Sequence, residues 1–278
     1  GWSAEIHASI SAYDIKTGQM NFQAQKLAEY IAAGIAGYDS VPECIASAEV
    51  IFSMVTADQA LAAGQSVANS IPADCLFFDC NSCAPDTKRA ISRIINAAGG
   101  RYVDVALMSP VFPLLHQTPV LISGHAADDA MKMMERLGMS AKHARGEVGT
   151  ASSIKMVRSI MIKGLEALTA ECVLAGRKAG VEDIVLETLE QTFPDFGWTE
   201  RATYMLERMM VHGTRRAAEM REVALTVGQL GLVSGMSRAT TNWQQTIGDL
   251  QLDPKENNLA ARADAILAAL ADKPNLKE

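Results

Sequence analysis

A segment of serines and a lysine is the first place where residue types and spacing suggest chemistry. Ser152, Lys155 and Ser159 lie at positions i, i+3 and i+7 of GTASSIKMVRS, so they share one face of a helix. A lysine placed in this way can act as a general acid or base toward a substrate hydroxyl. Gly149, just before the helix, lets the backbone approach a ligand or a neighbouring strand closely. Most lysines are solvated surface residues, and the spacing alone does not decide between the two interpretations.

Two segments that follow apolar runs supply further candidate ligand contacts. Val55 ends the run EVIFSMV and Thr56 follows it, whereas Asn81 and Ser82 come shortly after the run CLFFD. In an open α/β sheet, ligands bind beyond the carboxyl ends of the strands, so Val55 and Thr56 are well placed to contact a cofactor. Asn81 and Ser82 offer hydrogen-bonding groups at another strand end. For Val55 and Thr56, position alone favours a simpler interpretation, a strand end followed by the start of a helix.

The second of these segments also contains a Cys80-x-x-Cys83 pair. Such a pair can form a redox couple or half of a zinc site. A zinc site needs two more ligands, and the sequence has neither a second CxxC pair nor a spaced histidine pair. We therefore expect no metal at this position.

Adjacent arginines in VHGTRRAAEMREV form another candidate site. Arg215 or Arg216 can bind a carboxylate or a phosphate through two parallel hydrogen bonds. The alternative is a solvated helix face on which Arg215 pairs with Glu219 at i, i+4.

An acidic residue near the start of the chain resembles the one that binds a ribose in dinucleotide-binding folds. Asp14 follows a short β-type run in ISAYDIK. In those folds the acid comes about 20 residues after a strand and a glycine-rich turn. Only thirteen residues precede Asp14 here, so the sequence leaves open whether it is a nucleotide ligand or an ordinary loop aspartate.

The elements that must position these residues fall into two halves. Up to about residue 145, apolar β-type runs at 49–55, 75–79, 101–107 and 119–124 alternate with helical periodicity at 57–71 and 85–100. This alternation predicts a mostly parallel, doubly wound sheet covered on both faces. The following segments have helical spacing at about 150–180, 181–192, 199–221, 235–250 and 258–271. We expect a Rossmann-type α/β domain over 1–148 and an all-α domain over 149–278, which begins with a long interdomain helix.

Composition excludes some classes of function. The 278 residues are 49% hydrophobic and 21% charged, as in globular proteins that bury a core. A net charge of −7 argues against a sequence-independent grip on nucleic acid. No apolar run is long enough to span a bilayer, and the first residues lack the pattern of a signal peptide. Five cysteines, an odd number, favour a reducing, cytoplasmic setting over a disulfide framework.

Taken together, these segments resemble the β-hydroxyacid dehydrogenase and 6-phosphogluconate dehydrogenase-like superfamily. The resemblance is closest to a branch with a C-terminal helical domain of unknown function. It runs in order along nearly the whole chain, through Asp14, VTADQA, DCNSCAPDTKR, YVDVALMSPV, TPVLISG, GTASSIKMVRSIMIKGLEAL and RRAAEM. It implies an NAD- or NADP-dependent oxidoreductase that transfers hydride between the cofactor and a small hydroxy acid, which can be phosphorylated or sugar-derived.

The resemblance also implies roles for particular residues. The catalytic lysine of the superfamily falls on Lys155, and a substrate-orienting position falls on Ser109. Where the superfamily usually has a Ser-Gly-Gly turn, this chain has Ser-Pro-Val, and where it commonly has an asparagine four residues after the lysine, this chain has Ser159. A hydroxyl reaches less far than an amide and lacks its donor, so both differences concern the substrate more than the type of reaction.

The cofactor prediction rests on Asp14. An acid that accepts both ribose hydroxyls favours NAD, because the 2′-phosphate of NADP would meet a like charge. Lys16 could soften that repulsion. The first strand of the fold and its glycine-rich turn, which holds the pyrophosphate, are missing from this sequence. We therefore expect that the sequence starts inside the domain.

Two alternatives to a hydroxy-acid dehydrogenase remain. One is a non-catalytic ligand-binding or assembly protein that retains the dehydrogenase scaffold, and the missing glycine-rich turn supports this interpretation. A reductase acting on an imine is a third interpretation, against which Lys155 argues.

A further expectation concerns assembly. Met and Leu residues cluster in ATYMLERMMVHG, at 202–213, more densely than a lone helix can leave exposed. This cluster and the resemblance both predict a homodimer or a higher oligomer.

Overall fold

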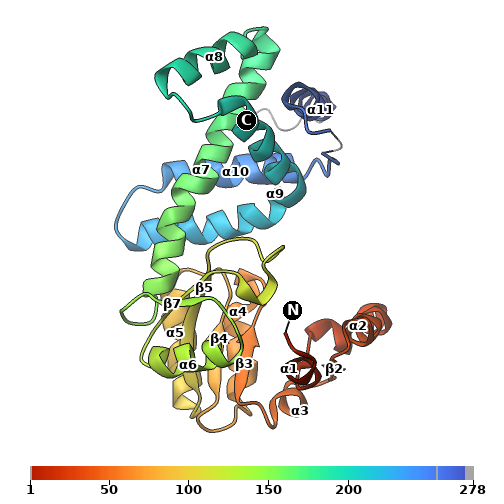
Figure 1. The fold of residues 1–278 in the computed structure, drawn as a ribbon, viewed down its shortest axis with the longest axis vertical. Coiled ribbons are helices and arrows are strands. Elements are labelled where there is room, and N and C mark those ends of the chain that lie inside the picture. Colours follow the sequence, from red (N-terminus) through yellow and green to blue (C-terminus); the bar gives the residue numbers. More distant parts are fainter. Residues whose placement is uncertain (1, 255, 273–278) are drawn as a thin grey trace. The chain divides into compact units, whose positions relative to one another are not determined.

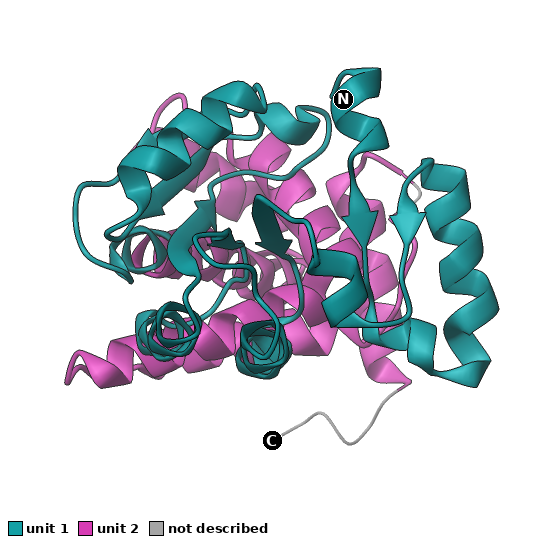
Figure 2. Cartoon of the chain, turned by 90° about the horizontal axis from the view of Figure 1, so that it is seen from below, with its two compact units in different colours: residues 1–155 teal, residues 156–278 magenta. Residues whose placement is uncertain are grey.

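The computed structural model describes residues 2–254 and 256–272, and the chain forms two compact units, 1–155 and 156–278 (Figure 2). The N-terminal unit contains all the strands of the described residues, and the helices from residue 156 onward make up the C-terminal unit. This confirms the predicted order of an α/β region followed by helices. The compact units divide within helix α7 (Thr150–Ala179), a few residues after the predicted domain boundary, which stays a prediction.

The main sheet of the N-terminal unit has five strands that lie side by side in chain order (Figure 1). They are β3 (Val50–Ser53), β4 (Leu76–Asp79), β5 (Arg101–Leu107), β6 (Val120–Ser123) and β7 (Ala141–His143). Every neighbouring pair is parallel except β5 and β6. The four apolar runs of the sequence are thus confirmed as strands. The periodicity did not indicate β7, because its three residues are only partly apolar and partly exposed.

Side chains of this sheet alternate between two cores, as successive residues of a strand point to opposite faces. Phe77 of β4 packs with Ile91 in one core, and Phe78 packs with Met134 in the other. The helices that cover the two faces are α4 (Ala60–Ala68), α5 (Pro85–Ala97) and α6 (Ala127–Arg136). Helices on both faces explain why the central strands β4 and β5 carry apolar side chains on both faces.

A separate pair of strands precedes the main sheet. β1 (Ser11–Ala12) and β2 (Ala36–Gly37) are parallel and pair only with each other among the described residues. The helical segments around them are α1 (Ala4–Ala8), η1 (Ile15–Gly18), α2 (Met20–Ala33) and α3 (Val41–Ile45). β1 confirms the β-type run before Asp14. A further strand, expected from the resemblance, stays a prediction.

The described part of the C-terminal unit is helical throughout. After α7 come α8 (Glu182–Thr192), α9 (Trp198–Gln229), α10 (Gly235–Gly248) and α11 (Leu259–Ala271). Helix α9 extends beyond its expected end at residue 221, because buried Val223 and Val227 continue its apolar face. The N-terminal unit also has two further short 3-10 helices, η2 (Ala57–Gln59) and η3 (Leu115–Gln117). The described residues of the C-terminal unit have none.

The Met- and Leu-rich segment at 202–213 is mostly internal, which corrects one argument for an oligomer interface. Leu206, Met209 and Met210 are buried in the core of the C-terminal unit, where α7, α8, α10 and α11 also contribute. Tyr204 and Val211 are the exposed large apolar residues of the segment, at 55% and 50%. A single helix could not bury this cluster, but the neighbouring helices of the same chain do.

The two longest helices are amphipathic rather than uniformly apolar. Helix α7 has 30 residues and α9 has 32, and both carry charged residues along their length. No helix among the described residues combines the length and the apolar character that a bilayer crossing requires.

Candidate active site

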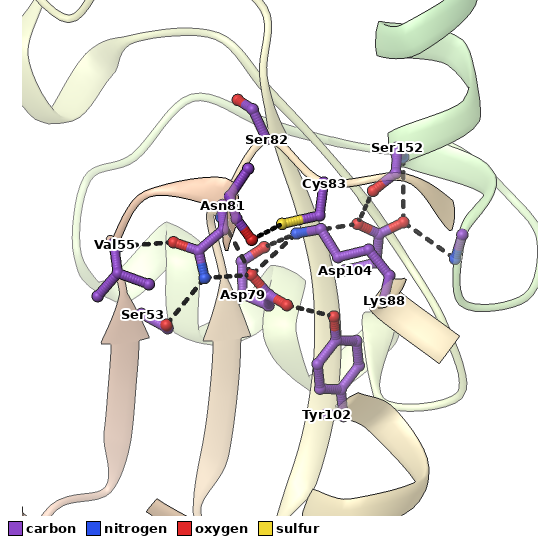
Figure 3. Close-up of polar contacts among 12 residues, drawn as sticks. Ser53, Val55, Asp79, Asn81, Ser82, Cys83, Lys88, Tyr102, Asp104 and Ser152 are labelled. Atoms are coloured by element: carbon purple, nitrogen blue, oxygen red, sulfur yellow. Dashed lines mark hydrogen bonds and ion pairs between the residues drawn. The ribbon is translucent and has the colours of Figure 1, made fainter. Parts of the chain in front are cut away.

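The loop after β4 is held in a defined conformation through Asn81. Its side-chain amide donates to Ser53 Oγ at 2.9 Å and to Asp79 Oδ1 at 2.8 Å, and its backbone N–H donates to the same carboxylate oxygen at 3.0 Å. Its Oδ1 accepts from the N–H of Val55 at 2.6 Å (Figure 3). Asn81 therefore joins the carboxyl ends of β3 and β4, the edge of the sheet at which ligands are expected.

Lys155 and Ser82 meet at this edge, although they are 73 residues apart in the sequence. Lys155 Nζ donates to Ser82 Oγ at 2.6 Å, and both side chains are partly buried. The lysine lies in the first turns of α7, and the serine directly follows Asn81. An amine in hydrogen-bond contact with a hydroxyl at the edge of the site can supply or accept a proton, the chemistry predicted for Lys155.

Asp104 holds the beginning of the helix that carries Lys155. Its carboxylate accepts from the N–H of Gly149 at 3.0 Å, from the N–H of Ser152 at 3.1 Å and from the Ser152 hydroxyl. Free N–H groups and the helix dipole make a helix N-terminus favourable for a negative charge. Gly149 has a φ of +100°, a backbone conformation that residues with a Cβ rarely adopt, so this position favours glycine.

Beneath this edge lies a fully buried group of charged and polar side chains that the sequence analysis did not single out. Lys88 Nζ is 3.0 Å from Asp79 Oδ1 and 3.6 Å from Asp104 Oδ1, and it donates to the Asp79 carbonyl at 2.6 Å. Tyr102 donates its hydroxyl proton to Asp79 Oδ2 at 2.7 Å (Figure 3). Asp79 and Asp104 lie opposite each other on β4 and β5, so strand register brings them together.

The sequence carried two signals for this group. Each aspartate stands within or at the end of an apolar strand run, LFFD and RYVDVAL. Lys88 shares the buried face of α5 with Ile91 and Ile95, where a charge is unexpected. A charged residue at an apolar position calls for a partner, and only tertiary structure identifies it.

Burial and neighbouring charges act on these groups in opposite directions. Desolvation is the strongest single influence on Lys88 and lowers its pKa, but the charges of Asp79 and Asp104 together outweigh it, so the pKa is raised. Lys88 is thus a buried cation. Burial, followed by the charge of Asp79, raises the pKa of Tyr102 well above its usual range, which keeps its hydroxyl a donor.

Three of the four predicted cofactor contacts, Val55, Thr56 and Asp14, lie after strands, and the fourth, Gly149, directly precedes α7. Val55 and Thr56 follow β3, both exposed, and Thr56 precedes the η2 turn. Asp14 follows β1, where its Oδ1 accepts from the N–H of Lys16 at 2.9 Å and its Oδ2 lies 3.4 Å from Lys26 Nζ. The structure brings Val55 into contact with Asn81, whereas the described contacts of the Asp14 side chain are local.

Two other predicted substrate residues, Ser109 and Ser159, make local hydrogen bonds. Ser109 is exposed in the segment after β5, with Oγ donating to the Pro110 carbonyl at 3.5 Å. Ser159 is buried in the C-terminal unit, and its Oγ accepts from Lys163 Nζ at 3.2 Å. Their contacts with a substrate stay predictions.

The two arginines have different surroundings within the C-terminal unit. Arg216 is 8% exposed and forms a two-point ion pair with Glu166, which also accepts from Gln244 at 2.8 Å. Arg215 is mostly exposed and pairs with Glu219 at i, i+4, the alternative arrangement that the sequence left open. The guanidinium of Arg216 therefore already binds a carboxylate of its own chain.

The Cys80-x-x-Cys83 pair lacks the properties of a reactive couple. Burial raises the pKa of the Cys80 thiol to about 12, and reactive cysteines need a lowered one. Cys83 is fully buried, with Sγ 3.6 Å from the Ala57 carbonyl oxygen. All five cysteines are free. Across residues 2–254 and 256–272, the structure has no group of three or more His, Cys, Asp or Glu side chains with metal-binding geometry.

Comparison with known families gives two matches, one in each unit. The model of the NAD-binding domain of 6-phosphogluconate dehydrogenase matches residues 5–141. A domain of unknown function (DUF1932) matches residues 177–247.

Individual relatives are consistent with these matches. A conserved hypothetical protein from Sinorhizobium meliloti has a crystal structure with 31% identity and a TM-score of 0.75, and the match covers 95% of this chain and 89% of that one. A conserved protein of unknown function, described as structurally similar to 3-hydroxyacid dehydrogenases, has 29% identity and a TM-score of 0.64, with coverage of 81% and 84%. A 3-hydroxyisobutyrate dehydrogenase from Pseudomonas aeruginosa is 27% identical over 62% of this chain and 60% of its own length.

Proposed function

Since this chain belongs to the family of NAD-binding proteins related to 6-phosphogluconate and 3-hydroxyacid dehydrogenases, we propose that it transfers hydride between a nicotinamide cofactor and a small hydroxy acid. The observation that carries the proposal is the 2.6 Å contact between Lys155 Nζ and Ser82 Oγ at the carboxyl edge of the sheet. Lys155 is the general acid–base that exchanges a proton with the substrate hydroxyl, and Ser82 orients its amine.

The described residues fit part of a dinucleotide. The exposed Val55 and Thr56 offer backbone and side-chain contacts at a strand end, and Asp14 can accept from ribose hydroxyls. No glycine-rich turn between a strand and a helix occurs in the described part of the N-terminal unit. The described residues therefore offer contacts for a ribose at Asp14 and for other cofactor atoms at the end of β3, and none of this kind for the pyrophosphate. When bound, the nicotinamide supplies the hydride acceptor or donor.

NAD is the proposed cofactor in preference to NADP. The carboxylate of Asp14 would repel a 2′-phosphate, which supports this choice. Lys26, 3.4 Å from Asp14, and nearby Lys16 reduce the repulsion, so the preference is a matter of degree.

The proposed substrate is a small hydroxy acid whose oxygens contact Asn81, Ser82 and Ser109. The substrate role of Ser159, which belongs to the C-terminal unit, stays a prediction from the resemblance. Asn81 also has a structural task, because its amide and carbonyl join β3 to β4. An arginine would bind the substrate carboxylate or phosphate. Arg215 suits this task better than Arg216, since its side chain is 60% exposed and Arg216 is paired with Glu166.

A screen of hydroxy acids with NAD and NADP, followed by cofactor absorbance, tests the reaction. Lys155→Met removes the amine while keeping an unbranched chain of similar length. We expect turnover to fall by about 10²–10⁴-fold, the usual contribution of a general acid or base, with the Kd for the cofactor unchanged. Weaker cofactor binding with unchanged turnover per bound cofactor would contradict the assigned role.

A non-catalytic binding protein is the alternative, and calorimetry separates the two. Binding of NAD(H) without turnover of any substrate in the screen would favour a binding protein.

We also propose that the chain forms at least a homodimer. Exposed apolar residues on α7, among them Met161 and Leu168, support this proposal.

A further inference from the structure

The fully buried lysine of α5 contacts both carboxylates that hold the candidate active site. Lys88, Asp79 and Asp104 have no exposed side-chain surface. Lys88 Nζ lies between the two acids, 3.0 Å from Asp79 Oδ1 and 3.6 Å from Asp104 Oδ1 (Figure 3). Lys88 lies below the loop that contains Asn81 and Ser82, and it is not one of the predicted ligand contacts.

Each acid fixes a different side of the site. Asp79 accepts twice from Asn81, and thereby sets the loop in which Ser82 is the next residue. Asp104 accepts from Gly149 and Ser152, and thereby sets the first turn of α7. Lys155 follows Ser152 by less than one helical turn.

We propose that Lys88 is a positioning residue that fixes the Asn81–Ser82 loop relative to the first turn of α7, and so places the Lys155 amine against Ser82. The ionic contacts of Lys88 join the two carboxylates directly, and with them the hydrogen bonds that each carboxylate accepts. The expected effect of Lys88 on turnover rests on the proposed function, whereas its positioning role does not.

Electrostatics explains why a lysine stands at this apolar position. Two buried carboxylates side by side would repel each other strongly without a cation between them. Lys88 compensates one negative charge, and the N-terminus of α7 favours the charge of Asp104. Tyr102 and Ser123 donate further hydrogen bonds to Asp79 and Asp104. An apolar residue in place of Lys88 would leave the acids free to move apart.

The test measures Lys155 directly and needs no substrate. The full chain is labelled with a limiting amount of acetic anhydride, and acetylation of each lysine is read by peptide mass spectrometry. Lys142, which is exposed, serves as the internal reference. In Lys88→Met we expect the relative labelling of Lys155 to rise about fivefold, the factor for loss of one net hydrogen bond.

Matched variants separate positioning from general destabilisation. Met134→Ala truncates another fully buried side chain, in the core on the opposite face of the sheet, and is expected to leave Lys155 labelling unchanged. Lys88→Arg, which keeps the charge, is expected to restore part of the wild-type protection. If Lys88→Met does not fold, Lys88→Gln decides, because it keeps a polar side chain at this position while it removes the charge that joins the two acids.

Unchanged Lys155 labelling in a folded Lys88→Met chain, or an equal increase in Met134→Ala, would overturn the proposal. With an active substrate, Lys88→Met should lower kcat and leave the cofactor Kd unchanged. Failure of every substrate in the screen would reject the proposed function, and the labelling result would still decide the role of Lys88.

Discussion

At the scale of single residues, the candidate site depends on polar side chains that are placed by other polar side chains. Lys155 has its position because Ser82 Oγ accepts a hydrogen bond from its Nζ and because Asp104 fixes the start of its helix. Asn81 is held from three directions, by Ser53, Val55 and Asp79. Such a fully satisfied network is rigid, whereas a partly satisfied one would be costly to bury.

The choice of cofactor is a prediction at this scale. Replacing Asp14 by serine removes the charge that would repel a 2′-phosphate and the acceptor for ribose hydroxyls. We expect the Kd for NAD to rise about tenfold, as for loss of one hydrogen bond to a charged group, and the Kd for NADP to fall or stay constant. Calorimetric titration with both cofactors measures the change.

The control for this experiment is Asp128→Ser, the same change at an exposed position on α6. It should leave both Kd values as they are. Equal weakening of NAD and NADP binding in Asp14→Ser would show that Asp14 does not distinguish the two cofactors.

At the scale of elements, the contact between α9 and α10 in the C-terminal unit depends on two glycines. Helices α9 and α10 meet at Gly213 and Gly248, without side chains between them. A Cβ on Gly213 would lie 2.4 Å from the Gln244 carbonyl oxygen and 2.7 Å from Gly248 Cα. Backbone cannot move aside as a flexible side chain can, so the helices themselves would have to separate.

We therefore expect Gly213→Ala to lower the free energy of unfolding by about 1–3 kcal/mol, the usual cost of overpacking. The gain in helix propensity, about 1 kcal/mol for Gly to Ala, offsets only part of this cost. Urea unfolding followed by circular dichroism gives the value.

Gly228, near the end of the same helix, is the matched control, because a Cβ there meets nothing within 4 Å. Gly228→Ala should leave stability unchanged or raise it by up to about 1 kcal/mol. A stabilised Gly213→Ala chain would mean that the two helices do not approach as closely as described.

At the scale of the whole molecule, assembly is the property left to test. The C-terminal unit buries Leu206, Met209 and Met210 internally, yet α7 keeps Val157, Met161 and Leu168 exposed at 50%, 71% and 58%. Spacings of four and seven residues place these three side chains along one side of the helix. Exposed apolar stripes of this kind mark interaction sites in many proteins.

We expect light scattering at micromolar concentration to give at least twice the 29.8 kDa chain mass. Met161→Glu should shift the mass toward the monomer, because a buried charge without a partner opposes association. Ile184→Glu, at another exposed apolar position, on α8, should not. A monomer mass for the unchanged chain would reject the prediction.

The sequence by itself determined the four apolar strands of the main sheet, the helices α4 and α5 and the helices from α7 onward, because apolar periodicity is a local property of consecutive residues. It did not indicate β7, α2 or α6. It also placed Asn81, Ser82 and Val55 at one edge of a parallel sheet, since the carboxyl ends of parallel strands lie together. Only the tertiary structure decided which polar groups meet. The pairs Lys155–Ser82, Asp104–Ser152 and Arg216–Glu166 join residues that are 73, 48 and 50 positions apart. Strand register and helix packing set such pairs, and no local pattern encodes either of them.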